Sequence, residues 1–197
     1  MTVVGATELR EGSKPGDAET ATMHKFSSGG GFSNIMKTPD YQKDAVATYL
    51  SKHNPGYKSY ETDDNGKIPK DTDGIYNRAG RGYLDVSANG LNGVVVLDGK
   101  EYHSGGTSMS ALITRIINER ISNGKKGPLD FLNPALYQNP GTFNDITSGD
   151  QHMGGPAGDD GPSFCHNNGF SAVEGWGPVS GLGTPDYGKM LKVLGQL

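Results

Sequence analysis

Glycine is the feature that most constrains this chain. It makes up 31 of the 197 residues, more than twice its usual share of about 7%. Because glycine adopts positive φ angles and allows close backbone contacts, we expect tight turns and packed loops. Hydrophobic residues are only 33% of the chain, but disordered chains with so few also carry high net charge. The formal net charge is only −4, so the chain is expected to be globular and loop-rich.

The same composition excludes several kinds of partner. A charge balance of −4 gives no broad basic surface, so no nucleic-acid partner is expected. No apolar run approaches the ~18–20 residues of a membrane span, so no membrane partner is expected either. The first residues lack the charged and apolar regions of a signal peptide. Cys165 is the single cysteine, which leaves no internal disulfide.

Short apolar runs with β-branched residues predict strands at residues 2–6, 83–88 and 94–97. Asp98-Gly99, after the third run, is a two-residue turn signal and predicts a hairpin that returns through residues 100–103.

Helical spacing of apolar residues is clearest at residues 110–122, with further helices predicted from Pro39 to about residue 51 and over 186–197. Residues 52–82 are charged and contain glycine, and are expected to form a loop. Strands that alternate with helices predict an α/β fold with a parallel sheet.

The run Gly105-Gly106-Thr107-Ser108-Met109-Ser110 directly precedes the clearest helix. Two glycines allow a sharp turn, and the helix N-terminus favours developing negative charge, which suits a nucleophilic serine. A serine at this position is also the commonest helix cap. Ser108 is therefore a candidate nucleophile whose assignment depends on the rest of the chain.

The Gly-Thr-Ser-x-Ser run occurs in the sedolisin family of serine-carboxyl peptidases, and a similar run occurs in subtilisins. The remaining motifs follow the sedolisin order and resemble its tripeptidyl-peptidase branch. They are SGGGFSN at 28–34 with PDYQ at 39–42, YLDVSA at 83–88, GPLDFLNP at 127–134, FNDITSG at 143–149, and GFSAVEGW at 169–176 leading to GLGTP at 181–185.

The resemblance implies a subtilisin-like α/β fold in which a parallel sheet has flanking helices. Residues 1–197 would be the C-terminal portion of the peptidase domain. Ser108 would be the nucleophile, with Gly106, Thr107 and Asp85 lining its pocket, although Asp85 is alternatively structural. In this family the serine is activated by a Glu that an Asp orients, and another Asp forms the oxyanion hole.

All three family carboxylates lie upstream of the strand with which this chain begins. The resemblance therefore implies a serine peptidase for peptide or protein substrates at acidic pH, inactive without its N-terminal half as a partner. It also implies secretion or an acidic lytic compartment.

Two aspartates of the chain itself, Asp40 and Asp44, have i,i+4 spacing that could mimic the missing pair, but helix capping is favoured for Asp40 beside Pro39. His103 lies on a predicted strand, and surface or packing roles are favoured for the histidines. A second departure follows Ser108, where the apolar helix begins about one turn earlier than in the family. Misplacement by ~1 Å can cost ~100-fold in rate.

The resemblance also implies one Ca²⁺ site. Asp145 and Ile146 match family ligands, and Val173 and Gly175 match its carbonyl donors. Gly177 stands where the family has a further aspartate, so the site is expected to be weakened because Ca²⁺ prefers several carboxylate oxygens. A turn or cap aspartate is the alternative for Asp145.

Two functions remain open at this point. The first is the nucleophile-bearing part of a sedolisin-type peptidase. The second is a peptidase-derived binding or effector protein without catalysis, favoured by the shortened segment after Ser108, by Gly177 and by the lone Cys165. Trp176 is expected to be a core aromatic residue.

Overall fold

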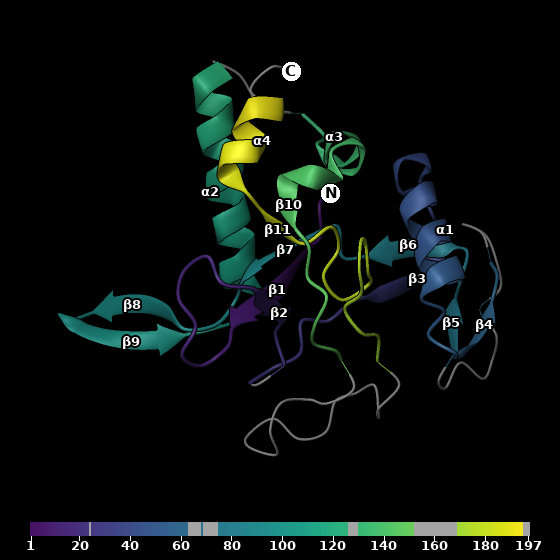
Figure 1. The fold of residues 1–197 in the computed structure, drawn as a ribbon, viewed down its shortest axis with the longest axis horizontal. Helices are drawn as coiled ribbons and strands as arrows, with labels where there is room; N and C mark the ends of the chain where they lie inside the picture. The colour runs from purple at the N-terminus through teal and green to yellow at the C-terminus, as the bar shows by residue number, and fades with distance from the viewer. Residues whose placement is uncertain (24, 63–67, 69–74, 126–129, 152–168, 195–197) are drawn as a thin grey trace.

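A small mixed sheet lies at the centre of the molecule (Figure 1). The computed structural model describes all residues except 24, 63–67, 69–74, 126–129, 152–168 and 195–197. Strand β1 (Val4–Leu9) pairs in parallel with β7 (Val86–Asn89) and antiparallel with β2 (Glu19–Ala21). The β1–β7 pair confirms the parallel α/β element of the prediction, whereas the antiparallel β2 makes this three-stranded sheet mixed.

Helix α2 (Thr107–Lys125) covers one face of this sheet and contacts both β1 and β7. Its side chain Ile121 is fully buried, and Ile117 packs against the core, as the predicted apolar stripe requires. Helix α4 (Tyr187–Leu194) lies beside α2. The Lys189 N–H donates to Asp186 Oδ1 at 3.0 Å, so Asp186 caps the first turn of α4.

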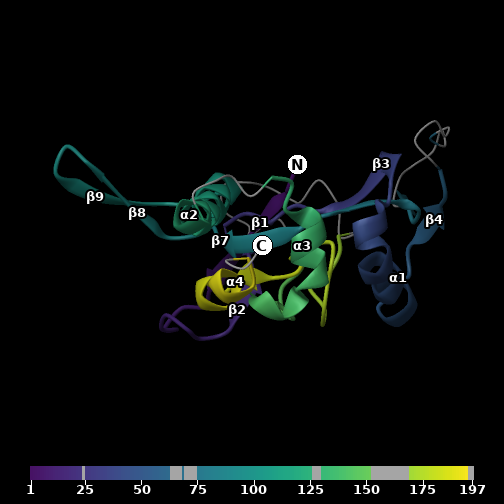
Figure 2. The same cartoon turned by 90° about the horizontal axis from the view of Figure 1, so that it is seen from above.

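A second group of elements lies to the right of the sheet in Figure 2, at the end of the molecule opposite to α2 and α4. Its members are β3 (Gly31–Lys37), η1 (Asp40–Gln42), α1 (Lys43–Lys52), β4 (Lys58–Tyr60), β5 (Ile75–Asn77) and β6 (Gly80–Tyr83). Strand β3 pairs antiparallel with β6, and β4 pairs in parallel with β5. The prediction of a loop over 52–82 is therefore wrong, since it contains two strands and most of a third.

The predicted strand over 83–88 is also wrong in one respect, because β6 ends at Tyr83 and β7 begins at Val86. Between them, the Asp85 N–H donates to the Val3 carbonyl at 3.0 Å, and the Asp85 carbonyl accepts from the Leu182 N–H at 2.9 Å. These contacts to two distant segments replace strand pairing at this position.

The predicted hairpin is confirmed as β8 (Gly93–Leu97) and β9 (Lys100–Ser104), which pair antiparallel. Further along the chain lie α3 (Asn133–Gln138), η2 (Pro140–Thr142) and β10 (Phe143–Asn144). Strand β10 pairs antiparallel with β11 (Thr184–Pro185), which brings the chain back to α4.

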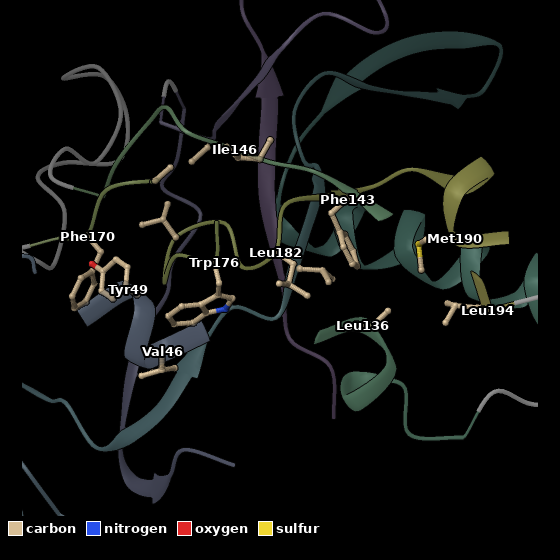
Figure 3. Close-up of a cluster of buried hydrophobic side chains, with 14 of the residues drawn as sticks. Val46, Tyr49, Leu136, Phe143, Ile146, Phe170, Trp176, Leu182, Met190 and Leu194 are labelled. Atoms are coloured by element: carbon tan, nitrogen blue, oxygen red, sulfur yellow. The ribbon is translucent and has the colours of Figure 1, made fainter. Parts of the chain in front are cut away.

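One hydrophobic core extends from α1 across the loop around Trp176 to α3 and α4 (Figure 3). Trp176 is only 5% exposed, and its Nε1–H donates to the Leu84 carbonyl at 2.9 Å. This confirms Trp176 as a core residue with its polar atom satisfied. Other large buried members of the core are Tyr49, Ile121, Leu136, Phe143, Ile146, Met190 and Leu194.

Among the described residues, no helix has the length and apolar character needed to cross a membrane.

Candidate active site

Ser108 is the second residue of the 19-residue helix α2, and its side chain is exposed. Strand β9 ends at Ser104, and the chain turns into the helix through Gly105 and Gly106, whose φ is +144°. This conformation is one that glycine adopts readily and other residues rarely do. The predicted position of Ser108 at a helix start is confirmed.

Two backbone hydrogen bonds fix this turn. The Gly106 N–H donates to the Gly90 carbonyl at 2.7 Å, and the Met109 N–H donates to the Gly106 carbonyl at 3.0 Å. Because the first N–H groups of a helix have no partner within it, the turn presents donors and the positive end of the helix dipole beside Ser108. This is an arrangement that can stabilise an anionic oxygen.

The first turn of α2 packs so closely against the sheet that Gly90, directly after β7, has no room for a side chain. A Cβ built there would lie 2.6 Å from Ala6 Cβ and 2.8 Å from Ser110 Oγ. The Gly90 N–H in turn donates to the Thr7 carbonyl at 2.9 Å. Gly90 therefore joins the carboxyl ends of β1 and β7 to the turn before Ser108, and ligands of α/β proteins bind at such strand ends.

Two further side chains at this end were not singled out from the sequence. Glu8 is 1% exposed at the carboxyl end of β1. Strand alternation puts it on the same face as Ala6, which is the face that α2 covers. Ser110 is fully buried, and its Oγ has no hydrogen-bond partner among the described residues. The sequence did carry a signal for Glu8. It lies two residues after Ala6 in the strand sequence VGATEL, so its charged side chain falls on the same face as an apolar one.

The structure puts Asp85 away from Ser108. It precedes β7, whereas Gly90 follows that strand, and at about 3.3 Å per residue the two lie ~16 Å apart along it. Asp85 is 0% exposed and forms an ion pair with Arg81 Nη2 at 2.6 Å. The structure therefore favours a structural role for Asp85 over the expected position in the pocket around Ser108.

Asp85 is the centre of a buried polar cluster. The Val3 N–H donates to its Oδ2 at 2.7 Å, and the Tyr137 hydroxyl donates to its Oδ1 at 3.1 Å. Gln42 Nε2 donates to the Tyr137 hydroxyl at 2.6 Å. Burial, and next the Asp85 carboxylate, raise the pKa of Tyr137 well above its ordinary value, so its hydroxyl stays protonated as a donor.

Asp40 and Asp44 do not join Ser108. They lie at the start of the η1–α1 segment, and α1 and α2 lie on opposite sides of the molecule (Figure 1). Asp40 pairs with Lys43 at 2.5 Å, and the hydrogen bond and charge of Lys43 lower its pKa. Among the residues that the structure describes, no side chain caps η1 or α1, so the expected capping role of Asp40 is wrong.

No described side chain forms a hydrogen bond with the Ser108 hydroxyl, and His103 is an exposed residue of β9. Cys165, His24, His152 and His166 lie outside the described residues, so the predictions for them remain predictions.

The residues expected at the Ca²⁺ site do converge in part. Asp145 is exposed, and its Oδ2 accepts a hydrogen bond from the Gly175 N–H at 2.8 Å. Ile146 is buried, and Val173 packs against the core. The N–H and carbonyl of Gly177 both bond to Gly181. Among the described residues, no three His, Cys, Asp or Glu side chains form a group that could hold a metal ion.

The chain is similar over almost its whole length to two fungal proteins. It is 47% identical over 205 residues to aorsin of Aspergillus oryzae, a match that covers 98% of this chain and 29% of aorsin. It is 43% identical over 196 residues to tripeptidyl-peptidase sed1 of Aspergillus fumigatus, covering 97% of this chain and 28% of that protein. No protein-family model matches the chain.

A solved structure of Pseudomonas sedolisin, a serine-carboxyl proteinase complexed with two molecules of pseudo-iodotyrostatin, has the same fold. The TM-score is 0.66 at 20% identity, over 97% of this chain and 45% of that one. The chain thus spans less than a third of the curated relatives that it matches and less than half of this solved structure. The chain is therefore similar to a part of aorsin and of tripeptidyl-peptidase sed1, and it shares the fold of the matching part of sedolisin.

Proposed function

We propose that this chain is the nucleophile-bearing portion of a sedolisin-type serine peptidase that cleaves peptide or protein substrates at acidic pH. The observation that carries the proposal is the exposed Ser108 at the N-terminus of α2, held by the Gly106–Gly90 hydrogen bond at the carboxyl ends of two parallel strands. Several relatives of the chain are named tripeptidyl-peptidases, which supports this interpretation of Ser108.

The proposed chemistry divides between this chain and a complementary portion of the domain. Ser108 Oγ attacks the scissile carbonyl, and the helix N-terminus contributes N–H donors toward the developing oxyanion. A general base must remove the hydroxyl proton, and none of the described side chains bonds to Ser108 in that role. We propose that acidic groups of an N-terminal portion supply it, so the isolated chain is inactive.

Complementation tests this division. The chain is assayed at pH 3–5 on a chromogenic tripeptide substrate, alone and after refolding with the remaining part of the Aspergillus oryzae relative. We expect turnover only in the mixture, and its loss in Ser108→Ala but not in Ser51→Ala, an exposed serine of α1. Turnover by the chain alone contradicts the proposed inactivity. Equal turnover by Ser108→Ala contradicts the role of Ser108 itself.

A second function is favoured by one observation. Within the described part of the chain the Ser108 hydroxyl has no acidic or imidazole partner, while the fold around it is intact. A non-catalytic protein that binds peptides would keep the glycine turn before Ser108 but would lack the general base that activates the serine. Complementation separates the two functions, because a binding protein stays inactive when the remaining part of a peptidase is supplied.

We further propose that any Ca²⁺ at the Asp145 loop is bound weakly and stabilises structure. Asp145 offers a single carboxylate, and carbonyls of Ile146, Val173 and Gly175 would have to supply most other oxygens. Tight Ca²⁺ sites use six to eight oxygens with several carboxylates. With glycine at position 177, this donor set fits a weakened site.

Acidic activity also suggests where the protein works. We propose secretion, or delivery to an acidic lytic compartment, as part of a longer polypeptide. Immunolocalisation with pH-sensitive dyes tests this, and residence in a neutral compartment contradicts it.

A further inference from the structure

The β8–β9 hairpin projects from the body of the molecule as a two-stranded ribbon (Figures 1 and 2). Asp98 and Gly99 connect its strands with φ angles of +51° and +72°, as a type I′ turn requires. Val94, Val96 and Leu97 are 58%, 65% and 60% exposed, and Val95 and Tyr102 are each 50% exposed. Neither face of the ribbon is covered by the described residues.

Such a ribbon is poorly stabilised by itself. Isolated two-stranded hairpins are marginal in water, and three or more strands are usually needed. Four consecutive exposed apolar residues and an unpaired strand edge are the features by which sheets recruit further strands. No third strand pairs with β8 or β9 in the part of the chain that the structure describes.

The register shows which groups the free edge of β9 offers. Leu97 lies opposite Lys100 across the two-residue turn, and Val95 lies opposite Tyr102. In an antiparallel pair the residues of alternate positions exchange hydrogen bonds, and the backbone groups of the others point outward. The N–H and carbonyl groups of Glu101 and His103 therefore face the free edge.

We propose that this edge binds a second copy of the chain, with two β9 strands antiparallel about a two-fold axis at Tyr102. Glu101 then lies opposite the partner's His103, and the symmetry forms this pair twice. Carboxylate and imidazole are complementary, and cross-strand pairs of this kind stabilise a sheet. The two Tyr102 residues face each other at the axis, and the result is a four-stranded sheet in a dimer of closed two-fold symmetry.

The β8 edge offers no comparable match. Its outward groups belong to Val94 and Val96, which carry no charge to set the register. Charge complementarity therefore selects β9 and an antiparallel copy. The proposal is independent of the chemistry proposed for Ser108.

Charge exchange tests the interface. Sedimentation velocity over a concentration series measures the dimer dissociation constant of the full 197-residue chain. Glu101→Lys and His103→Glu should each weaken the dimer about tenfold or more, because each replaces two attractive pairs by unfavourable ones. The double variant restores opposite pairs and should recover the wild-type constant. Glu61→Lys, the same charge change at an exposed residue directly after β4, on the opposite side of the molecule from the hairpin (Figure 1), should leave it unchanged.

A disulfide provides a second measurement. Directly opposite residues at non-hydrogen-bonded positions have Cα atoms about 4.5 Å apart, within disulfide range. In a Cys165→Ser background, Tyr102→Cys should form a covalent dimer under oxidation. A chain that stays monomeric at all concentrations overturns the proposal, even if the hairpin binds another extended peptide. The proposal is also overturned if neither single variant changes the dimer dissociation constant, or if the double variant does not recover the wild-type value.

Discussion

Substituting Gly90 by alanine tests the link between the sheet and the turn before Ser108. The added Cβ would lie 2.6 Å from Ala6 Cβ, 2.8 Å from Ser110 Oγ and 3.3 Å from the Gly106 carbonyl oxygen. Ordinary carbon contacts are about 3.5–4.0 Å, so α2 or β7 must move by about 1 Å. The nearest atoms belong to short side chains and backbone, which have no flexible end that could swing away.

Overpacking of this kind costs about 1–3 kcal/mol. We therefore expect Gly90→Ala to lower the free energy of unfolding by that amount in urea titrations followed by circular dichroism. In the complemented peptidase, a ~1 Å displacement of Ser108 should also reduce turnover by roughly 100-fold.

Gly141→Ala is the matched control. A Cβ added at Gly141 would have no atom of the described residues within 4 Å of it, and alanine at a compatible position is neutral or stabilises by about 0.4–1 kcal/mol. If the two variants have the same unfolding free energy within about 0.5 kcal/mol, the close approach of α2 to the sheet is not what fixes the turn.

Three further variants test other contacts. Asp85→Asn removes the charge that pairs with buried Arg81 and should destabilise the fold by about 3 kcal/mol in urea unfolding; a loss under 1 kcal/mol contradicts the role given to the cluster. Asp186 has a pKa lowered mainly by the Lys189 backbone N–H, so its charge stabilises above the ordinary aspartate pKa of about 3.9 and ceases to do so as pH falls through the lowered value. Thermal unfolding should therefore show Asp186→Asn less stable than wild type at pH 6 and equal to it near pH 2; a gap that persists at pH 2 contradicts the capping argument. Millimolar Ca²⁺ should raise the unfolding midpoint of the wild type but not of Asp145→Asn, with EDTA reversing the rise; an unchanged wild-type midpoint contradicts the weak Ca²⁺ site.

Local signals predicted the parts of the fold that local chemistry determines. Asp98-Gly99 defined the hairpin, and the spacing of isoleucines defined α2. Strand β3 (Gly31–Lys37) was missed because its sequence GFSNIMK contains polar residues and begins with glycine. Its pairing with β6 depends on residues more than 40 positions away, which periodicity does not report.

The candidate site divides in the same way. The position of Ser108 followed from the glycines and the helix that flank it. The burial of Asp85 and Glu8 did not, because each depends on elements brought together only in the folded chain. Asp40 shows that a local signal can also mislead. Its position beside Pro39 predicted a helix cap, but its carboxylate forms an ion pair with Lys43 instead.

The cluster around Asp85 has a consequence for synthesis. Its hydrogen bonds join Val3 to Asp85 across 82 positions and Asp85 to Tyr137 across 52. At roughly 5–20 residues per second, a ribosome needs on the order of ten seconds between the first and last of these residues. During that interval β1 has left the ribosome, but Asp85 and Tyr137, which complete the cluster at its first residues, have not yet all been made. Because contacts of high sequence separation form slowly, the first strand is exposed to premature association while the chain is being made.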